Sequence, residues 1–388
     1  MPGLFQGLEV GRRALLTSQM TLQTIGHNIA NVNTPGYTRQ RVNIASTMPE
    51  SNTIGSIGSG VQVTDIKHIR DLFLGNQYRQ ESKSLGEWTY KDKVLSQVES
   101  VFNEPSRVTL ENGTTIGGNL SDKMNDFWKG WDNFSQNPSD FNSRKNLIHS
   151  TSTMVSSFNK LSDDIDKLRS SIDADMNNYT SEINRLTGEV SRLNLQIKSL
   201  EVGGVTANDL RDTRDLILDN LSSLVDINTN ENQNGDMVVY IGSMSVVNGG
   251  DAINIEAKVA NVNGTPTHKL VWEGTDFELT NTAGQLKALI ESRDVIIPKY
   301  IEKLDTLAAA MVEQVNALHV QGETADGQTG ISFFDPTKTT AETLSINPSI
   351  LSDSSYSLVV SAKKYADSDG TLASDIAKIR NENVLSKT

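Results

Sequence analysis

The longest regular pattern in the chain is a heptad repeat of apolar positions between Met154 and Leu200. Steps of four and three residues alternate along it, with one extra four-residue step near Met176, which is typical of a coiled-coil seam with a single stutter. Charged residues occupy the other faces, so the pattern predicts a helix about 70 Å long that is buried along one side. The seam consists of Met154, Phe158, Leu161, Ile165, Leu168, Ile172, Met176, Tyr179, Ile183, Leu186, Val190, Leu193, Ile197 and Leu200.

Two other segments carry helical stripes that match this seam. The first stripe consists of Leu74, Tyr78, Leu85, Trp88, Leu95, Val98 and Phe102. The second consists of Leu286, Ile290, Ile297, Ile301 or Tyr300, Leu304, Leu307, Met311, Val315 and Leu318. Pro298 predicts a kink in the second stripe or the start of a new helix. Three long helices joined by loops predict an elongated antiparallel bundle.

The pattern changes between Asp226 and about Leu279, where short runs rich in Val, Ile and Thr are separated by NG, GG and NGT turn signals. These runs predict a small β domain inserted into the helical body. Residues 43–70 are predicted to be extended, with GSIGSGVQV as a hairpin turned by glycine. The fold class expected from all these patterns is mainly α with a β insert.

The first predicted helix, residues 4–33, has an apolar stripe but no charged flank. No Asp, Glu, Lys or Arg occurs from Ala14 to Thr38, where Gln, Thr and Asn fill the other faces. Charge is depleted in the cores of protein–protein interfaces, so this composition favours packing against other protein chains. Asn33, Thr34, Pro35 and Gly36 are predicted to end the helix and redirect the chain.

Composition narrows the range of partners. The net charge of −13 argues against binding to nucleic acid or to anionic lipid, both of which select basic surfaces. No apolar run approaches the ~18 residues of a membrane span, and the polar residues near the N-terminus interrupt any signal-peptide core. The absence of cysteine excludes disulfides, thiolate metal sites and a cysteine nucleophile.

Candidate chemistry is sparse. The five histidines lack ligand spacing and are predicted to be capping or surface residues. GSIGSG lacks both the order of a phosphate-binding loop and a following helix, and DSDG lacks the remaining ligands of a calcium loop. LRDTRD, residues 210–215, resembles an acid/base pair only superficially, and a salt-bridged helix face is the preferred interpretation. We therefore expect no enzyme, no catalytic or metal-binding residues and no cofactor.

Several motifs resemble those of bacterial flagellar axial proteins. Asn28–Asn31 and Thr34–Tyr37 match the Asn-Ile-Ala-Asn and Thr-x-Gly-Tyr mark that rod and hook proteins share. The chain outside the β insert further resembles the hook-associated protein 1 (FlgK) family. The segments that carry this resemblance are Thr38–Arg41, Arg70–Glu81, Asn208–Val225, Gly284–Gly322 and Asp326–Phe334.

The resemblance implies a structural role in the extracellular flagellum. Members of the family form a ring at the junction between hook and filament, with hook protein on one side and the next hook-associated protein on the other. The flagellar type III apparatus exports them without a cleaved signal peptide. Members usually end in a long, Gln-rich C-terminal helix that contacts an export chaperone. No such helix follows here, so we expect a fragment and do not transfer the chaperone contact.

Two groups of residues are predicted to mediate assembly. The self-assembly stripe and its polar neighbours are Leu8, Leu15, Leu22, Ile25, Asn28, Ile29, Asn31 and Val32. The joint that follows, with contacts between subunits, is formed by Thr34, Pro35, Gly36, Tyr37, Arg39 and Arg41. Packing of the joint within its own subunit is the alternative. A second hypothesis for the whole protein is a surface adhesin in which the β insert is the binding part.

These interpretations predict a division of the chain into five regions. An N-terminal assembly helix is followed by an extended linker with a hairpin, a helical bundle in two sequence segments, an inserted β-rich outer domain, and a mixed segment that returns to the bundle. Their predicted bounds, in that order, are 1–35, 36–70, 71–225 with 284–320, 226–283, and 321–388.

Overall fold

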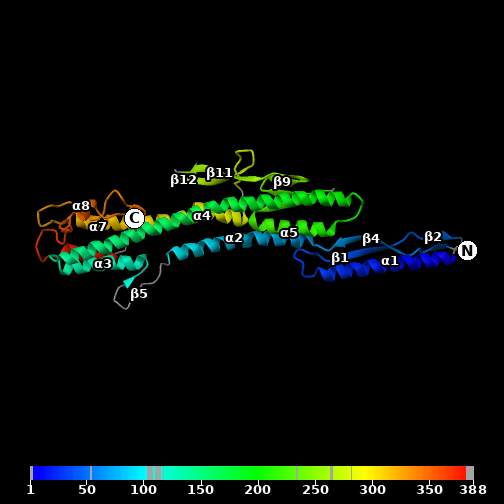
Figure 1. Ribbon diagram of the computed structural model, residues 1–388, viewed down its shortest axis with the longest axis horizontal. Coiled ribbons are helices and arrows are strands. Elements are labelled where there is room, and N and C mark those ends of the chain that lie inside the picture. The colour runs from blue at the N-terminus through cyan, green and yellow to red at the C-terminus, as the bar shows by residue number, and fades with distance from the viewer. Residues whose placement is uncertain are drawn as a thin grey trace. The chain divides into compact units, whose positions relative to one another are not determined.

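The computed structural model describes residues 3–52, 55–102, 108–109, 115–116, 118–232, 235–262, 265–280 and 282–381. The chain forms two compact units, whose helices and strands are shown in Figure 1. The first unit consists of Met1–Tyr90 and Asp173–Leu289, and the second consists of Lys91–Ile172 and Ile290–Thr388. Helices and small antiparallel sheets make up both units, which confirms the predicted class, mainly α with a β insert.

The first unit begins with helix α1 (Gly3–Ala30), which contacts a two-stranded antiparallel sheet. We call this sheet, formed by β1 (Gln40–Ser46) and β4 (Val61–His68), the N-terminal ribbon. Gln40 lies opposite His68 at one end and Ser46 lies opposite Val61 at the other, with a bulge between them. The short strands β2 (Glu50–Asn52) and β3 (Gly55–Ile57) pair with each other, so the segment is extended as predicted. The hairpin predicted within GSIGSGVQV is wrong, because β3 at its start pairs with β2 and β4 at its end pairs with β1.

The rest of the first unit combines helices with the predicted β insert. It contains the start of α2 (Leu72–Phe102), the end of α4 (Phe141–Glu201), α5 (Asn208–Leu224) and α6 (Gly284–Glu291). Four strands pair in the order β10-β9-β8-β7, and a hairpin follows them. The strand bounds are β7 Ile227–Glu231, β8 Met237–Ile241, β9 Met244–Asn248, β10 Asp251–Ala252, β11 Ile255–Val262 and β12 Thr265–Trp272.

Polar side chains of α4 bind the β insert along its backbone. Asn194 donates to the carbonyl oxygens of Met237 (2.9 Å) and Gly249 (3.0 Å), and its own oxygen accepts the Met237 N–H. Asn184 pairs with both backbone groups of Ile255 at 2.8 Å. Because these amides replace the ladder bonds that strand ends lack, they fix the insert along the helix.

The second unit has an aromatic core between its helices. It contains β5 (Val108–Thr109), β6 (Thr115–Ile116), α3 (Leu120–Gln136), the start of α4, and α7 (Ile297–His319), followed by α8 (Pro348–Ser352), α9 (Thr371–Lys378) and a short 3₁₀ turn (Ile379–Asn381). Rings of α3 and of the segment after α7 pack together in its centre, with ring centroids 4.7 to 6.4 Å apart. They belong to Phe127, Trp128, Trp131, Phe134, His319, Phe333 and Phe334.

Two of the three predicted helical stripes are buried as expected. The α4 seam is buried at most of its positions, and only Leu200 at its end is largely exposed. In the stripe that contains Pro298, a π-helical turn at Ser292–Ile296 interrupts the helix, and α7 begins at Ile297 with proline in its first turn. The predicted interruption at Pro298 is therefore confirmed.

The stripe predicted for α2 is wrong. Trp88 is 68% exposed and Leu85 is 69% exposed, and Val98 is the one predicted position that is buried. Tyr90 and Val94, which the predicted stripe does not include, are buried with it. The reason lies in Gly86, where a Cβ atom would come within 2.2 Å of the Ser223 carbonyl oxygen. Because glycine has no side chain, the end of α5 approaches α2 closely at Gly86. The helix therefore buries the face that contains Gly86 and leaves the larger apolar residues exposed.

His319 is the one histidine for which the predicted capping or surface position clearly fails. It is fully buried between α7 and the segment after it. Its Nδ1 lies 2.7 Å from the Ile331 carbonyl oxygen, and its Nε2 accepts the Val360 N–H at 3.3 Å. These partners require the neutral ring with its proton on Nδ1. Burial lowers the pKa of His319 to about 4, although the bond to Ile331 opposes this effect.

Acidification is therefore expected to destabilise the second unit through His319. The unfolded histidine titrates near 6.5, so below that pH the unfolded chain binds more protons than the folded chain. The loss between pH 7 and pH 5 is about 2 kcal/mol. Urea unfolding of wild type and of His319→Gln at both pH values measures it. The glutamine variant should lose less stability on acidification, and equal pH slopes for the two proteins would contradict this role of His319.

Candidate functional site

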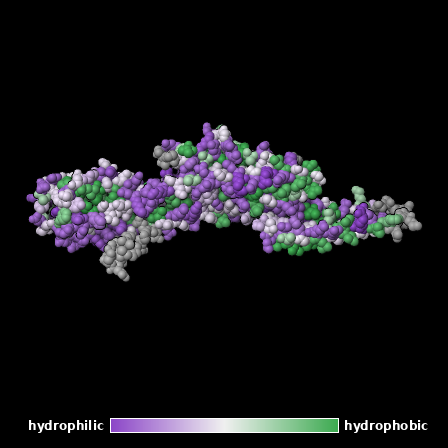
Figure 2. Space-filling view, in the orientation of Figure 1, coloured by the Kyte–Doolittle hydropathy of each residue, from purple (hydrophilic) through white to green (hydrophobic). Residues whose placement is uncertain are grey.

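Helix α1 presents the opposite of the usual amphipathic arrangement. Thr17 and Thr24 are buried on the side of the helix that is turned to the ribbon. The apolar stripe points away from it: Leu15 is 70% exposed and Leu22 is 68% exposed. The predicted stripe residues Leu8, Ile25, Ile29 and Val32 are exposed as well. Figure 2 shows hydrophobic side chains on the surface over α1.

Asn28 and Asn31 hold the end of α1 within the chain. Asn28 Oδ1 accepts hydrogen bonds from the Tyr37 hydroxyl and from the Gln40 N–H, both at 2.8 Å, and its Nδ2 donates to the Gln40 carbonyl oxygen. Asn31 donates to the His27 carbonyl oxygen at 3.1 Å and accepts the Thr34 hydroxyl. The two asparagines therefore end the helix and attach it to the start of β1.

The joint turns tightly against helix α5. Gly36 has φ +79°, and a Cβ atom there would lie 2.8 Å from the Leu216 Cβ, so both its conformation and its surroundings favour glycine. Tyr37 packs edge-on against His27 with the ring centroids 5.5 Å apart. Burial, and then the carboxylates of Asp209 and Asp212, raise the pKa of Tyr37. Tyr37 thus packs within its own chain.

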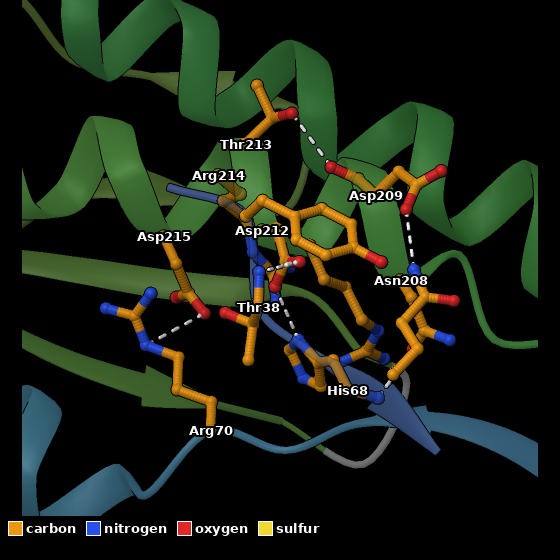
Figure 3. A network of polar contacts seen from close by, with 12 residues as sticks. Thr38, His68, Arg70, Asn208, Asp209, Asp212, Thr213, Arg214 and Asp215 are labelled. Atoms are coloured by element: carbon orange, nitrogen blue, oxygen red, sulfur yellow. Dashed lines mark hydrogen bonds and ion pairs between the residues drawn. The ribbon is translucent and has the colours of Figure 1, made fainter. Parts of the chain in front are cut away.

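A stripe of polar side chains on α5, which we call the α5 clamp, fixes the end of the ribbon where the chain enters β1 and leaves β4 (Figure 3). Its members, Asn208, Asp212, Asp215 and Asp219, recur every three or four residues and share one helix face. Asp212 is almost fully buried and accepts the Thr38 N–H at 2.8 Å, while its other oxygen lies 2.7 Å from His68 Nδ1.

The remaining members of the clamp bind the exit of the ribbon and the start of α2. Asn208 donates to the Ile66 carbonyl oxygen at 2.6 Å and accepts the His68 N–H at 3.3 Å. Arg70 and Arg79 both reach the carboxylates of Asp215 and Asp219, at 2.8 to 3.4 Å. These guanidinium side chains are largely buried, so the ion pairs are shielded from solvent and salt.

Sequence reasoning missed the clamp. The pattern LRDTRD predicts a salt-bridged helix face, but it does not reveal that the partners of these charges lie in distant segments of the chain. Arg214 is buried and donates to Asn194 (3.0 Å), the Gly235 carbonyl oxygen (2.8 Å) and Glu231 (2.8 Å). The available signal was the spacing of Asn208, Asp212, Asp215 and Asp219, which places acceptors on one helix face.

A groove of about 930 Å³ adjoins the exposed stripe in the first unit. Its walls come from α1, from β4 and from the loop between α4 and α5. Leu16, Met20, Val61, Val63, Leu200 and Val205 supply its apolar lining. Leu200 at the end of α4 and Val205 in the loop are 60% and 70% exposed, so the apolar surface continues from α1 onto these residues.

The other predicted joint residues lie at the surface. Thr34, Pro35, Arg39 and Arg41 are exposed, and the two arginines form no ion pair with any residue that the structure describes. The joint thus combines intrachain packing at Gly36 and Tyr37 with exposed cations. Its role between subunits stays a prediction.

Two kinds of site were expected to be absent and are not found among the described residues. Among them, no group of three or more His, Asp or Glu side chains is arranged to hold a metal ion. Within the same ranges, no helix is long and apolar enough to cross a lipid bilayer.

Known families match two parts of the sequence. Residues 95–334 match the family described as "Flagellar hook-associated protein FlgK helical domain". Residues 8–38, which contain the exposed stripe and most of the joint, match "Flagella basal body rod protein". The second match covers the segment whose Asn-Ile-Ala-Asn and Thr-x-Gly-Tyr motifs resemble those of axial proteins.

Individual relatives extend these matches over nearly the whole chain. Flagellar hook-associated protein 1 of Bacillus subtilis is 30% identical over 98% of this chain and 81% of its own length. The Salmonella typhimurium protein of the same name is 25% identical over 82% of this chain and 57% of its own length. This chain therefore spans little more than half of the Salmonella protein.

A solved structure has a similar fold. It is described as that of "the flagellar hook junction protein FlgK from Burkholderia pseudomallei" and matches with a TM-score of 0.56 at 20% identity. The match covers 68% of this chain and 46% of the other. None of these relatives supports the adhesin hypothesis. The chain belongs to the flagellar hook-associated protein 1 (FlgK) family, and is thus a structural component of the bacterial flagellum and not an enzyme.

Proposed function

We propose that this protein joins hook to filament by assembling into a ring in which α1 packs against neighbouring chains. The observation that carries the proposal is the inverted amphipathicity of α1. The helix buries threonines and exposes a contiguous row of leucine and isoleucine side chains. Large exposed apolar patches mark interaction sites, and this one lacks the charges that would keep a surface solvated.

The proposed partners are hook protein on one side of the ring and the next hook-associated protein on the other. The name of the Burkholderia relative, a hook junction protein, supports this placement. We also propose that the chain reaches the extracellular flagellum through the flagellar export apparatus without a cleaved signal. No residue of this chain is assigned to an export chaperone.

The predicted division of the chain is retained as part of the proposal. Residues 1–35 act as the assembly helix, and the α5 clamp holds the linker 36–70 against the helical body. Residues 226–283 form an outer domain, which the amides of Asn184 and Asn194 keep in place along α4. In this scheme the contacts between subunits come first from α1 and then from exposed joint residues.

A charge placed in the stripe is expected to block assembly without unfolding the monomer. Leu22→Glu introduces a carboxylate at a position that is 68% exposed, so the thermal midpoint should stay within about 2 °C of wild type. In the ring the same carboxylate would be buried without a partner. In the source bacterium, electron microscopy should show that most cells carry hooks without attached filaments.

Gln23→Glu is the matched control. This neighbouring residue is exposed, lies at the flank of the stripe, and receives the same charge. Filaments should attach normally in this strain. Equal attachment in the Leu22→Glu and wild-type strains would contradict the role of the stripe.

A further inference from the structure

One end of the N-terminal ribbon carries three exposed cations, of which two arginines form no ion pair with any described residue. Arg41 on β1 lies directly opposite Lys67 on β4, so both side chains are on the same face. Arg39 is two residues before Arg41, and its carbonyl oxygen accepts the Ile69 N–H at 2.9 Å, which continues the ladder by one step. Arg39 therefore extends the same row. We call Arg39, Arg41 and Lys67 the basic row.

The geometry of the basic row is unfavourable for the isolated protein. Like charges directly opposite each other in an antiparallel ladder repel and weaken the pairing. Asp65 is the nearby carboxylate; it forms an ion pair with Lys67 at 3.1 Å and accepts a hydrogen bond from Asn43 at 2.6 Å, but it pairs with neither arginine. Lys67 remains 62% exposed, and Arg39 and Arg41 have no ion-pair partner among the described residues. A partner with negative charge would relieve this repulsion.

The charge of the chain is distributed unevenly, and this points to the partner. Residues 1–70 carry six Lys and Arg against three Asp and Glu. The whole chain carries 35 Lys and Arg against 48 Asp and Glu, so the excess of acidic residues lies entirely after residue 70. A basic N-terminal segment on an otherwise acidic chain is complementary to the body of another copy of the same chain.

We infer that the basic row binds an acidic surface of a second copy, formed by residues after position 70. Such a contact joins two different surfaces of the same protein, so it repeats head to tail and generates a ring or a helix. The inference rests on the proposed function and adds a second contact to it. The stripe of α1 supplies apolar area, and the basic row selects the orientation of the neighbouring copy through charge.

Arg41→Glu separates binding from folding. The new carboxylate would lie opposite Lys67, which turns a repulsive cross-strand pair into an attractive one, so the ribbon should not be weakened. The same change reverses the charge in the middle of the basic row. In the source bacterium we expect about tenfold fewer cells with attached filaments. Lys364→Glu, which changes net charge equally at an exposed position of the second unit, should leave attachment unchanged.

The outcomes distinguish this inference from the proposed function. Normal attachment in the Arg41→Glu strain overturns the inference and leaves the junction role intact. Normal attachment in a strain that lacks the gene altogether overturns the junction role itself. If Arg41→Glu lowers the thermal midpoint, Arg39→Glu is tested in its place, because Arg39 lies outside the paired strands. Normal filament attachment in the Arg39→Glu strain would then overturn the inference.

A photo-crosslinking residue at position 41 identifies the occupant. Irradiation of assembled flagella should give a product with twice the mass of this chain, in which peptides after residue 70 carry the link. Links exclusively to hook protein or to another flagellar protein would overturn the assignment to a second copy.

Discussion

Replacing Trp131 with alanine is expected to lower the free energy of unfolding of the second unit by about 3 to 5 kcal/mol. The indole is completely buried, and its ring centroid lies 4.9 Å from that of Phe333 and 6.1 Å from that of Phe134. His319 also packs against it at 6.2 Å. Alanine would leave a cavity among rings that belong to separate segments and cannot close together. Urea unfolding monitored by circular dichroism measures the loss.

Two variants test whether packing is the cause. Trp131→Phe keeps one aromatic ring and loses the other together with an indole nitrogen that has no hydrogen-bond partner among the described residues, so it leaves a smaller cavity than alanine and should cost less. Trp88→Ala makes the same chemical change at a position that is 68% exposed. Its effect should stay below about 1 kcal/mol. Similar losses at Trp131 and Trp88 would contradict the proposed core.

Replacing Asp212 with alanine is expected to destabilise the first unit by about 3 kcal/mol. The carboxylate accepts hydrogen bonds at both ends of the linker, from Thr38 and from His68. Alanine would leave these donors without an acceptor in a site where Asp212 is only 3% exposed. Chemical unfolding measures the loss. Limited proteolysis should in addition show faster cleavage between residues 38 and 70, because the α5 clamp would no longer hold the ribbon.

Asp209→Ala is the matched control on the same helix. Asp209 also reaches the linker, through Gln40 at 2.7 Å, but its side chain is 66% exposed. Solvent can replace the lost bond, so stability should change by less than about 1 kcal/mol. Asp212→Asn retains an acceptor for the Thr38 N–H, so its loss of stability should lie between those of Asp212→Ala and Asp209→Ala. If Asp212→Ala and Asp209→Ala behave alike, the clamp does not depend on the buried carboxylate.

The sequence predicts those elements whose periodicity is independent of their neighbours. The seam from Met154 to Leu200 is long enough that its heptad spacing determines the buried face. The joint is likewise predicted by residues with local conformational preferences, Pro35 and Gly36. No charged residue occurs between Ala14 and Thr38, and this composition predicts that the apolar stripe of α1 packs against a partner outside the chain.

Features that depend on distant segments could not be predicted. The buried face of α2 is set by the approach of Ser223 to Gly86, and no local pattern reveals this contact. The partners of Asp212 are 174 and 144 residues away in the sequence, so LRDTRD resembles an ordinary charged helix face when considered alone. The burial of His319 is equally invisible in the local sequence, because α3 and the segment after α7 cover it.

The direction of the chain through the N-terminal ribbon has a mechanical consequence. The chain enters β1 at Gln40 and leaves β4 at His68, and these residues are paired with each other. A force that pulls α1 away from α2 therefore acts on one end of the ladder and would open it one pair at a time. Asp212 binds Thr38 and His68 at this end, so tension must break its bonds before the strands can unzip.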